Sequence, residues 1–349
     1  MQTEVAKILS ASEEESQKAL EKAGQIIRNG GLVVFPTETV YGLGADATNE
    51  RATKSIFEAK GRPSDNPLII HLYSVEDAEK YTYTNDLYYK IAERFMPGPI
   101  TVILRAKDII PRSVTAGLDT VAVRIPVHPV AREFIRLAGV PVAAPSANLS
   151  GSPSPTCFKY AFSDMNGRVD MIIDGGESEF GLESTIVKIE DENTLTLLRP
   201  GAITVEDLKE ICPNVIISDA VLNALKEGER VLSPGMKYKH YAPKTEFFLL
   251  DGDLSARFDY ISKREGKVAL LCYDEERAQF ERIIPSSCLL SIGKKTEPMA
   301  QAKMLFTRLR DADALGADEI YAALPQLDGI GMALYNRMIR ASGYKIIKL

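Results

Sequence analysis

The chain has 349 residues, a length that accommodates two domains of ordinary size. Hydrophobic residues make up 45% and charged residues 26%, the composition of a globular protein with a buried core. The formal net charge is -6, so the chain lacks the basic excess that tight binding to a nucleic-acid backbone requires. We therefore expect any link to RNA to be indirect or local.

The cysteines and the apolar runs exclude further classes. Four cysteines are scattered with no Cys-x-x-Cys pair, which predicts neither a disulfide framework nor a zinc site. No apolar run approaches the roughly 20 residues that span a bilayer, and no signal peptide is recognisable. We expect a cytoplasmic protein without a membrane segment.

In chain order, the first 30 residues predict a strand and then a helix, with a capping box at Ser12 and Glu15 and a glycine turn at 29–31. The pattern then predicts short apolar strands at 32–35, 68–72, 100–104, 121–125, 140–144, 171–174, 184–189 and 194–198. Helices are expected between them at 52–59, 86–95, 129–137 and 205–211. This is the order of an α/β domain.

Residues 213–245 read as a linker, after which the strand and helix pattern restarts. Strands are predicted at 247–250, 268–272 and 320–323, with one helix through Ala302, Leu305 and Leu309 and another beginning near Met332. We predict a first domain at 1–212, a linker at 213–245 and a small α/β domain at 246–349.

Several familiar catalytic signatures are absent from the sequence. It contains no P-loop, no Gly-x-Gly-x-x-Gly after a strand and no Gly-x-Ser-x-Gly elbow. His71, His128 and His240 lie far apart without metal-ligand spacing, so we predict no protein metal site.

Polar loops at strand ends remain as candidates, because ligands of α/β sheets bind at the carboxyl ends of strands. These loops are 36–44, 60–67, 145–154, 181–185 and the basic, aromatic segment 237–241. Taken singly, each is also compatible with an ordinary turn, a helix end or a solvated linker. Arg124 lies in an apolar strand and therefore needs an internal acidic partner or a ligand carboxylate.

Together these segments resemble the YrdC-type threonylcarbamoyl-AMP synthases, in their long two-domain branch. The resemblance is carried in order by the segments 36–43, 60–63, 66–68, 124–126, 145–148 and 183–185. It covers about residues 10 to 210, and the segment 233–243 extends it over nearly the whole chain. It implies a twisted, open mixed sheet with flanking helices, followed by a smaller Rossmann-like α/β domain.

The resemblance implies a nucleotidyltransferase that joins L-threonine, bicarbonate or CO2, and ATP into threonylcarbamoyl-AMP and diphosphate. A partner transferase then moves the threonylcarbamoyl group to an adenosine in tRNAs that read codons beginning with adenine. ATP is thus a substrate, and Mg2+ is expected with its triphosphate. No enzyme nucleophile is needed, since positioning and charge neutralisation suffice.

Roles carried over by the resemblance remain hypotheses. Lys60 and Arg62 are expected to neutralise the triphosphate, and Arg124 to bind the threonine carboxylate. Further threonine contacts are expected from Thr39, His71, Ser184 and the Ala144 backbone. Further ATP contacts are expected from Asn66, Thr120, Ser146, Ser154, Arg199 and Tyr241, with Asn148 supporting the Ser146 loop and His240 joining Tyr241 in a lid.

Two alternatives stay open at this stage. A carbamoyl-adenylating enzyme would use carbamoyl phosphate in place of threonine, although such proteins normally carry acylphosphatase-like and zinc-finger segments that this chain lacks. A non-catalytic RNA-binding module is the second, and the acidic balance of the chain counts against it.

Overall fold

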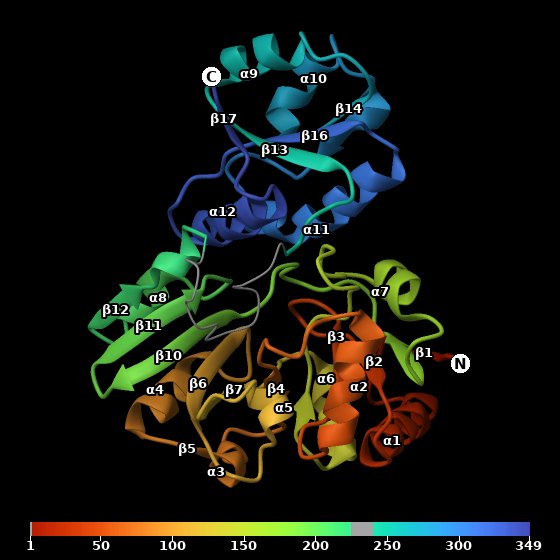
Figure 1. Cartoon of the computed structure of the whole chain (residues 1–349), viewed down its shortest axis with the longest axis vertical. Helices are drawn as coiled ribbons and strands as arrows, with labels where there is room; N and C mark the ends of the chain where they lie inside the picture. The colour runs from red at the N-terminus through yellow and green to blue at the C-terminus, as the bar shows by residue number, and fades with distance from the viewer. Residues whose placement is uncertain (1, 225–239) are drawn as a thin grey trace. The chain divides into compact units, whose positions relative to one another are not determined.

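The computed structural model describes residues 2–224 and 240–349, which form two compact units (Figure 1). The first unit comprises the described parts of residues 1–150, 154–179 and 183–237. The second comprises residues 151–153, 180–182 and the described part of 238–349. Each unit has its own sheet.

The first unit is built on a 12-stranded sheet that mixes parallel and antiparallel pairs, as predicted. Along the sheet the order is β1-β9-β2-β3-β8-β4-β7-β6-β10-β11-β12, with β5 paired to β6. The strands are β1 (Glu4–Lys7), β2 (Val33–Phe35), β3 (Gly42–Asp46), β4 (Ile69–His71), β5 (Thr82–Tyr83), β6 (Ile100–Ala106), β7 (Thr120–Arg124), β8 (Val142–Ala143), β9 (Met171–Asp174), β10 (Thr185–Asp191), β11 (Thr194–Arg199) and β12 (Asn214–Ile217).

Eight α-helices accompany this sheet in the described part of the first unit. They are α1 (Glu14–Arg28), α2 (Glu50–Lys60), α3 (Ala78–Tyr81), α4 (Asp86–Phe95), α5 (Arg112–Thr115), α6 (Pro129–Ala138), α7 (Phe158–Met165) and α8 (Val205–Lys209). Local sequence sets their ends: the Asn49 side chain caps α2, and Gly61 ends it with a left-handed φ of 60°.

The capping box predicted at Ser12 and Glu15 is wrong. Helix α1 begins at Glu14, and its N-cap residue, Glu13, makes no side-chain capping bond. The Ser12 hydroxyl lies 3.0 Å from that of Ser10 instead. A capping box does form at Thr204, ahead of α8, where the pattern was not singled out.

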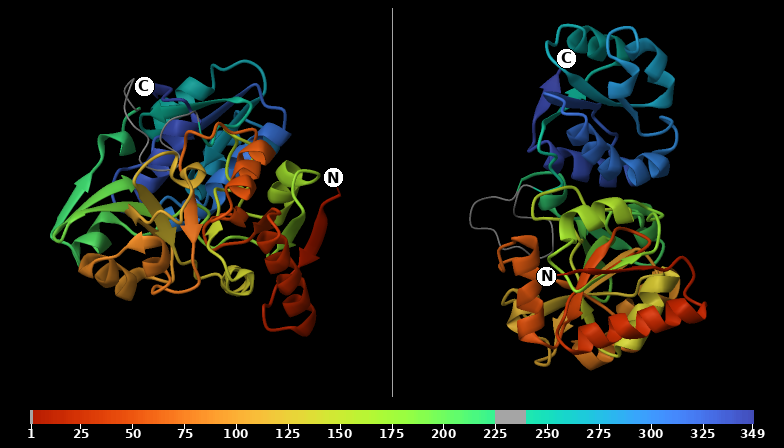
Figure 2. Two further views of the ribbon diagram at one scale, coloured as in Figure 1. Left: turned by 60° about the horizontal axis from the view of Figure 1, so that its bottom comes forward. Right: turned by 90° about the vertical axis from the view of Figure 1, so that its right-hand side faces the viewer.

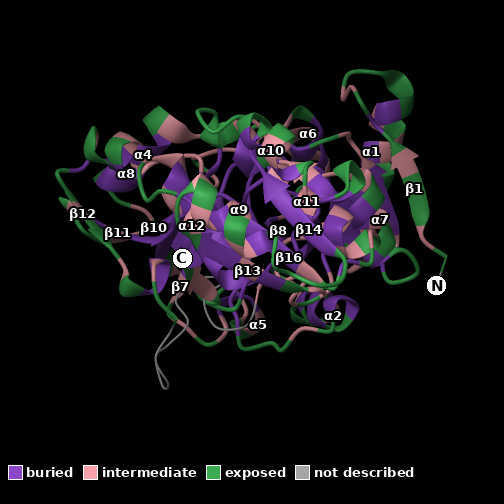
Figure 3. Cartoon of the chain, turned by 90° about the horizontal axis from the view of Figure 1, so that it is seen from above, coloured by how far each residue is buried: buried purple, intermediate pink, exposed green. Residues whose placement is uncertain are grey.

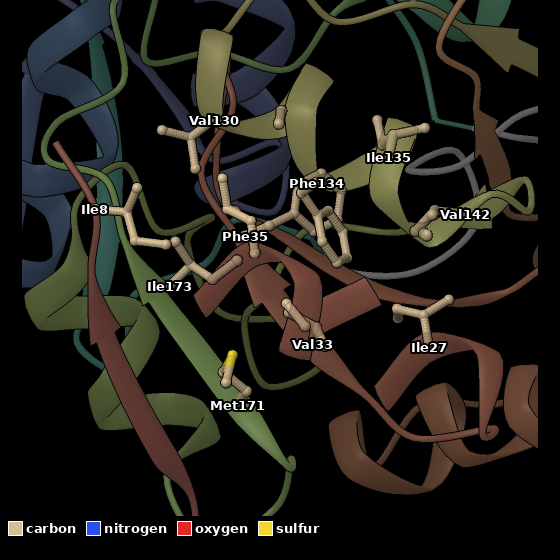
Figure 4. Close-up of a cluster of buried hydrophobic side chains, with 14 of the residues drawn as sticks. Ile8, Ile27, Val33, Phe35, Val130, Phe134, Ile135, Val142, Met171 and Ile173 are labelled. Atoms are coloured by element: carbon tan, nitrogen blue, oxygen red, sulfur yellow. The ribbon is translucent and has the colours of Figure 1, made fainter. Parts of the chain in front are cut away.

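Helices α1 and α6 pack together on one face of the sheet and cover a hydrophobic core of the first unit (Figure 4). The Phe35 ring of β2 packs against the Phe134 ring of α6 at a tilt of 41°, with ring centres 5.1 Å apart and Val33 and Ile173 in the same core. Gly24 lets the two helices approach closely, because a Cβ there would lie 2.7 Å from the Leu137 carbonyl oxygen.

The second unit is a three-layer α/β/α structure around five parallel strands, in the order β15-β14-β16-β13-β17. Helices α9 and α10 cover one face and α11 and α12 the other (Figure 2). The elements are β13 (Glu246–Asp251), α9 (Leu254–Ile261), β14 (Val268–Cys272), α10 (Arg277–Phe280), β15 (Leu289–Ser291), α11 (Pro298–Ala314), β16 (Glu319–Ala323), α12 (Ile330–Ala341) and β17 (Ile346–Lys348). This is the Rossmann-like arrangement that was predicted.

Strand interiors are buried while outer helix faces and loops are exposed (Figure 3). Strands β2, β3, β4 and β14 are buried at every residue, which explains why they read as continuous apolar or glycine-rich runs. No helix within the described ranges is both long and apolar enough to cross a membrane.

Some elements escaped the sequence pattern. Strand β3 begins inside the predicted loop 36–44 and continues to Asp46. Strand β12 lies inside the segment read as a linker, where it extends the sheet beside β11. Residues 320–323 were predicted to form the last strand, which is wrong because β17 follows and pairs with β13. These strands are short, so their pairing comes from neighbours distant in sequence.

Replacing Gly24 with Ala should destabilise the protein, although alanine favours helix formation. The added methyl group collides with the backbone of α6, so we expect the free energy of unfolding to fall by about 1–2 kcal/mol in urea titrations. Gln25→Ala, on the exposed side of α1, should stay within about 0.5 kcal/mol of the parent. Equal stability of the two variants would show that α1 and α6 can move apart at Gly24 without a cost in free energy.

Candidate active site

Four polar side chains form a row on one face of the first sheet. His71 ends β4 and Arg124 ends β7, and the two are register partners. Thr101 of β6 is the partner of Arg124 on its other side. Because register partners project from the same face, these three side chains neighbour one another. The Ser184 hydroxyl, just before β10, extends the row at 2.7 Å from the Thr101 hydroxyl.

Arg124 and Glu38 form a buried ion pair. The guanidinium Nη2 donates to Glu38 Oε1 at 2.5 Å, and the two side chains are 5% and 2% exposed. The acidic partner that the sequence required is thus a residue of loop 36–41. Arg124 Nε has no hydrogen-bond partner among the described residues, so the guanidinium keeps a donor for another acceptor.

His71 is neutral at physiological pH. Burial lowers its pKa from 6.5 to about 3, and the neighbouring Arg124 charge adds to this shift. Its Nδ1 atom is buried without a hydrogen-bond partner in the part of the chain that the structure describes. The His71 ring packs edge-on against Phe35, with ring centres 5.9 Å apart. The polar row therefore lies against the hydrophobic core that contains Phe35.

A second polar group surrounds the Lys60 ammonium at the end of α2. Lys60 Nζ donates to the carbonyl oxygens of Ser146 and of Asn148, the latter at 2.6 Å. The Ser146 hydroxyl donates to Asn148 Oδ1 at 2.5 Å. Lys60 therefore holds the loop after β8 in place, with Asn148 supporting Ser146.

Arg62, Asn66 and Thr120 lie at the same end of β4 and β7. Arg62 Nη2 donates weakly to the Asn66 carbonyl at 3.4 Å, and its guanidinium stands 5.8 Å from the Phe57 ring centre. The Asn66 side chain is fully buried, yet neither its amide nitrogen nor its oxygen has a partner within the described residues. An orphaned buried amide is unusual and indicates a place for a ligand.

The loop between β2 and β3 joins the two groups. Thr120 and Arg124 are the first and last residues of β7, about 13 Å apart along the strand. Glu38 bonds to Arg124 at one end of the loop, and at the other end Gly42 forms a β-bridge with Ser146. One loop thus spans from the expected threonine-carboxylate residue to the expected ATP-binding loop.

The remaining predicted residues of the first unit belong to the same networks. Arg199 donates to the Ser184 carbonyl at 3.0 Å and to its hydroxyl at 3.1 Å. The Ser154 hydroxyl donates to Glu183. The Ala144 N–H is bonded to the Ile69 carbonyl in the sheet, so its own carbonyl is the backbone group that can receive a ligand donor.

Thr39 is fully buried in loop 36–41, with its hydroxyl 2.9 Å from that of Thr37. Thr37 shapes this loop, since its hydroxyl donates to the Val40 carbonyl at 2.6 Å. Sequence reasoning did not assign roles to Thr37, Glu38, Thr101 or Glu183. A signal existed for Thr101, which is a polar residue in the apolar run 100–104.

Tyr241 lies in the second unit. Its ring stacks on Phe306 at 5.2 Å and faces the Arg337 guanidinium at 5.6 Å. His240 is next to it, with ring centres 5.7 Å apart. The preceding linker residues 233–239 lie outside the described residues, so the predicted lid stays a prediction. Within the described ranges, no group of three His, Cys, Asp or Glu residues is placed to hold a metal ion.

The low pKa of His71 should appear in the pH dependence of stability. The unfolded chain binds a proton near pH 6.5, whereas the folded chain stays neutral at this residue until about pH 3. Stability is therefore complete above pH 6.5 and falls with acidification through that window. Relative to His71→Gln, the parent should lose about 2 kcal/mol more between pH 7.5 and pH 5 in urea titrations. If the free energies of unfolding of the parent and of His71→Gln changed equally with pH, His71 would not be a buried neutral histidine.

The chain matches known proteins over both units. A family model described as "Telomere recombination" matches residues 25–201, and "Threonylcarbamoyl-AMP synthase, C-terminal domain" matches residues 203–343. A threonylcarbamoyl-AMP synthase of Pyrococcus abyssi is 40% identical, with 98% of this chain and 99% of the relative covered. One of Bacillus subtilis is 39% identical, with 94% of each covered.

Solved structures agree with these matches. The crystal structure of P. abyssi Sua5 complexed with L-threonine has a TM-score of 0.87 and 38% identity, with 100% of both chains covered. A variant of that protein with two alanine substitutions gives a TM-score of 0.89 at 37% identity, covering 99% of this chain and 98% of the other. This chain is a member of the threonylcarbamoyl-AMP synthase family, in its two-domain form.

Proposed function

We propose that this enzyme joins L-threonine, bicarbonate or CO2, and ATP into threonylcarbamoyl-AMP and diphosphate. The observation that carries the proposal is the single loop that links buried Arg124 to the Lys60 and Ser146 group. The threonine complex of a relative 38% identical over its whole length supports it. The product is the activated intermediate for forming N6-threonylcarbamoyladenosine in tRNAs that read codons beginning with adenine.

Threonine binds at the row formed by His71, Arg124 and Ser184. Its carboxylate pairs with Arg124, whose free Nε donor and buried setting favour an anionic acceptor. Neutral His71 offers Nδ1 as a hydrogen-bond partner for the amine or the carbamate formed from it. A pKa near 3 makes His71 too weak a base to keep the amine proton, which passes to solvent or bicarbonate.

Thr39 and Ser184 supply hydroxyl groups for the rest of the amino acid. Both are fully buried and already hydrogen-bonded to fixed neighbours, Thr37 and Thr101. Their positions are therefore set before the substrate arrives, which lowers the entropic cost of binding. The Ala144 carbonyl accepts an N–H from the substrate.

ATP binds at the second group. Lys60 and Arg62 bring two positive charges to the loops that hold Ser146 and Asn66, and the unpartnered Asn66 amide meets the nucleotide. Thr120, Ser154 and Arg199 complete the ATP contacts. The triphosphate then competes with the Ser146 and Asn148 carbonyls for the Lys60 ammonium.

The reaction needs two bond-forming steps. The threonine amine adds to CO2 and loses a proton, giving a carbamate. A carbamate oxygen then attacks the α-phosphorus of ATP and diphosphate leaves with the electron pair of the broken P–O bond. The chain contributes alignment and charge neutralisation rather than a nucleophile.

Mg2+ accompanies the triphosphate in this proposal. The described residues supply no acidic cluster of their own, which fits a cation held mainly by phosphate oxygens and water. Bound there, it would neutralise charge on the leaving diphosphate.

The remaining parts of the proposal concern organisation. Residues 213–245 connect a catalytic domain at 1–212 to a small domain at 246–349, and His240 and Tyr241 cover the nucleotide as a lid. A partner transferase receives the product, without stable RNA binding by this chain. The reaction takes place in the cytoplasm, consistent with four free cysteines.

One assay separates this function from its rivals. With ATP, bicarbonate and Mg2+, the purified protein should release diphosphate only when L-threonine is added. Release that needs carbamoyl phosphate instead would indicate the carbamoyl-adenylating alternative. RNA binding without any diphosphate release would indicate the non-catalytic module.

Arg124→Lys keeps the charge beside Glu38 but removes the forked guanidinium. We expect the KM for threonine to rise about tenfold or more while the KM for ATP stays within about twofold. Arg132→Lys is the matched control, because Arg132 stands over Tyr73 at 4.8 Å and has no assigned ligand role. An equal rise in both KM values would mean that Arg124 does not recognise the carboxylate.

A further inference from the structure

A cavity of about 480 Å³ opens in the second unit, where the proposed reaction has no role for it. Its volume lies in the usual range of small-molecule sites. Its walls come from residues 252–334, all within the second unit, so the kind of ligand that it fits can be inferred from this unit alone.

The cavity sits at the carboxyl edge of the parallel sheet. Leu250 of β13 pairs with Ala323 of β16, and Leu271 of β14 pairs with Ala322. Gly252, Tyr273 and Leu324 follow these strand ends and line the cavity together. Strands β13 and β16 are neighbours, yet the chain leaves β13 for α9 on one face and β16 for α12 on the other. Ligands of open α/β sheets bind at such switch points.

The start of α12 forms one wall. Its N-cap residue is Gly329 (φ 49°, ψ -125°), no side chain caps it, and its first turn has no acidic residue. A Cβ at Gly331 would lie 2.5 Å from the Gln326 carbonyl oxygen, so this glycine is required by the turn. No atom of the described residues lies within 4 Å of a Cβ at Gly329, a residue that lines the cavity, so the positive end of the helix is open to it.

A cation held by an ion pair also lines the cavity. Arg257 is 5% exposed and donates to both oxygens of Glu276, at 3.0 and 2.6 Å. Its Nε is buried without a hydrogen-bond partner in the described part of the chain. A buried guanidinium donor of this kind costs free energy unless a ligand satisfies it.

Lys295 adds an exposed positive charge, and hydrogen bonds hold its backbone. Its N–H donates to the Glu275 carboxylate, and its carbonyl accepts from Gln301 Nε2 at 3.2 Å. The exposed ammonium group can therefore reach a phosphate at the rim. Asp328, also exposed at the rim, would repel a bare anion but suits the hydroxyl groups of a ribose.

Apolar side chains complete the lining, namely Tyr273, Pro298, Leu324, Pro325, Ile330 and Leu334. Such a wall suits the face of a nucleobase, whereas inorganic phosphate would leave it in contact with water. From the switch point, the open helix start, the cations and this apolar wall, we propose that the cavity binds a nucleotide. The proposal does not depend on the activity assigned to the first unit.

Hydrogen–deuterium exchange of the full chain with ADP tests this site separately from the first unit. ADP should slow exchange in residues 324–334. Lys295→Glu should raise the ADP concentration for half-protection about tenfold, whereas Lys294→Glu should leave it unchanged. Lys294 is the matched control, since it pairs with Glu297 at 3.2 Å and does not line the cavity.

A fluorescence titration gives a second reading. The chain has no tryptophan, so Tyr273→Trp places a single reporter in the cavity wall. We expect a saturable change with ADP that Lys295→Glu weakens by the same factor. Absence of protection in 324–334 at millimolar ADP would overturn the proposal. Equal protection by inorganic diphosphate, or equal effects of the two lysine variants, would overturn it as well.

Discussion

The buried ion pair between Arg124 and Glu38 is the interaction on which the site of the first unit depends. A guanidinium in an apolar strand is costly, and only a close anion makes its burial acceptable. Glu38 supplies that anion from a loop, so pairing brings loop 36–41 to the sheet. The same contact leaves Arg124 Nε without a hydrogen-bond partner among the residues that the structure describes.

Loop 36–41 also links the Arg124 ion pair to the group around Lys60. Its far end forms a β-bridge with Ser146, whose carbonyl receives the Lys60 ammonium. Protein oxygens therefore pair with both the Arg124 guanidinium and the Lys60 ammonium. In the reaction that we propose, substrate anions replace or share these partners, so binding exchanges one set of charge contacts for another rather than creating charge burial anew.

The second unit differs from the first in the architecture of its sheet. Its five parallel strands are covered by helices on both faces, so function concentrates where the strands end. There the structure places an open glycine-flanked helix start, a buried arginine and an apolar wall around one cavity. Together with the site proposed for the first unit, this makes two proposed sites, each built by its own sheet.

The sequence by itself determined the family through its resemblance in six ordered motifs. It also determined the α/β class and most long elements, because apolar periodicity and glycine at helix ends act locally. It predicted α4 at its observed bounds, 86–95, and the end of α2 at Gly61. It also required a partner for Arg124, since burial of an unpaired charge is prohibitive. Which acidic residue pairs with Arg124 depended on the path of the loop that contains Glu38.

Only the tertiary structure decided that Glu38 is the partner, that Thr101 joins His71 and Arg124 in one row, and that the buried Asn66 side chain has no hydrogen-bond partner among the described residues. These facts follow from the paths of loops and from strand register between segments far apart in the chain. Short strands such as β3, β12 and β17 escaped prediction for the same reason: their stability comes from neighbours that local sequence does not name.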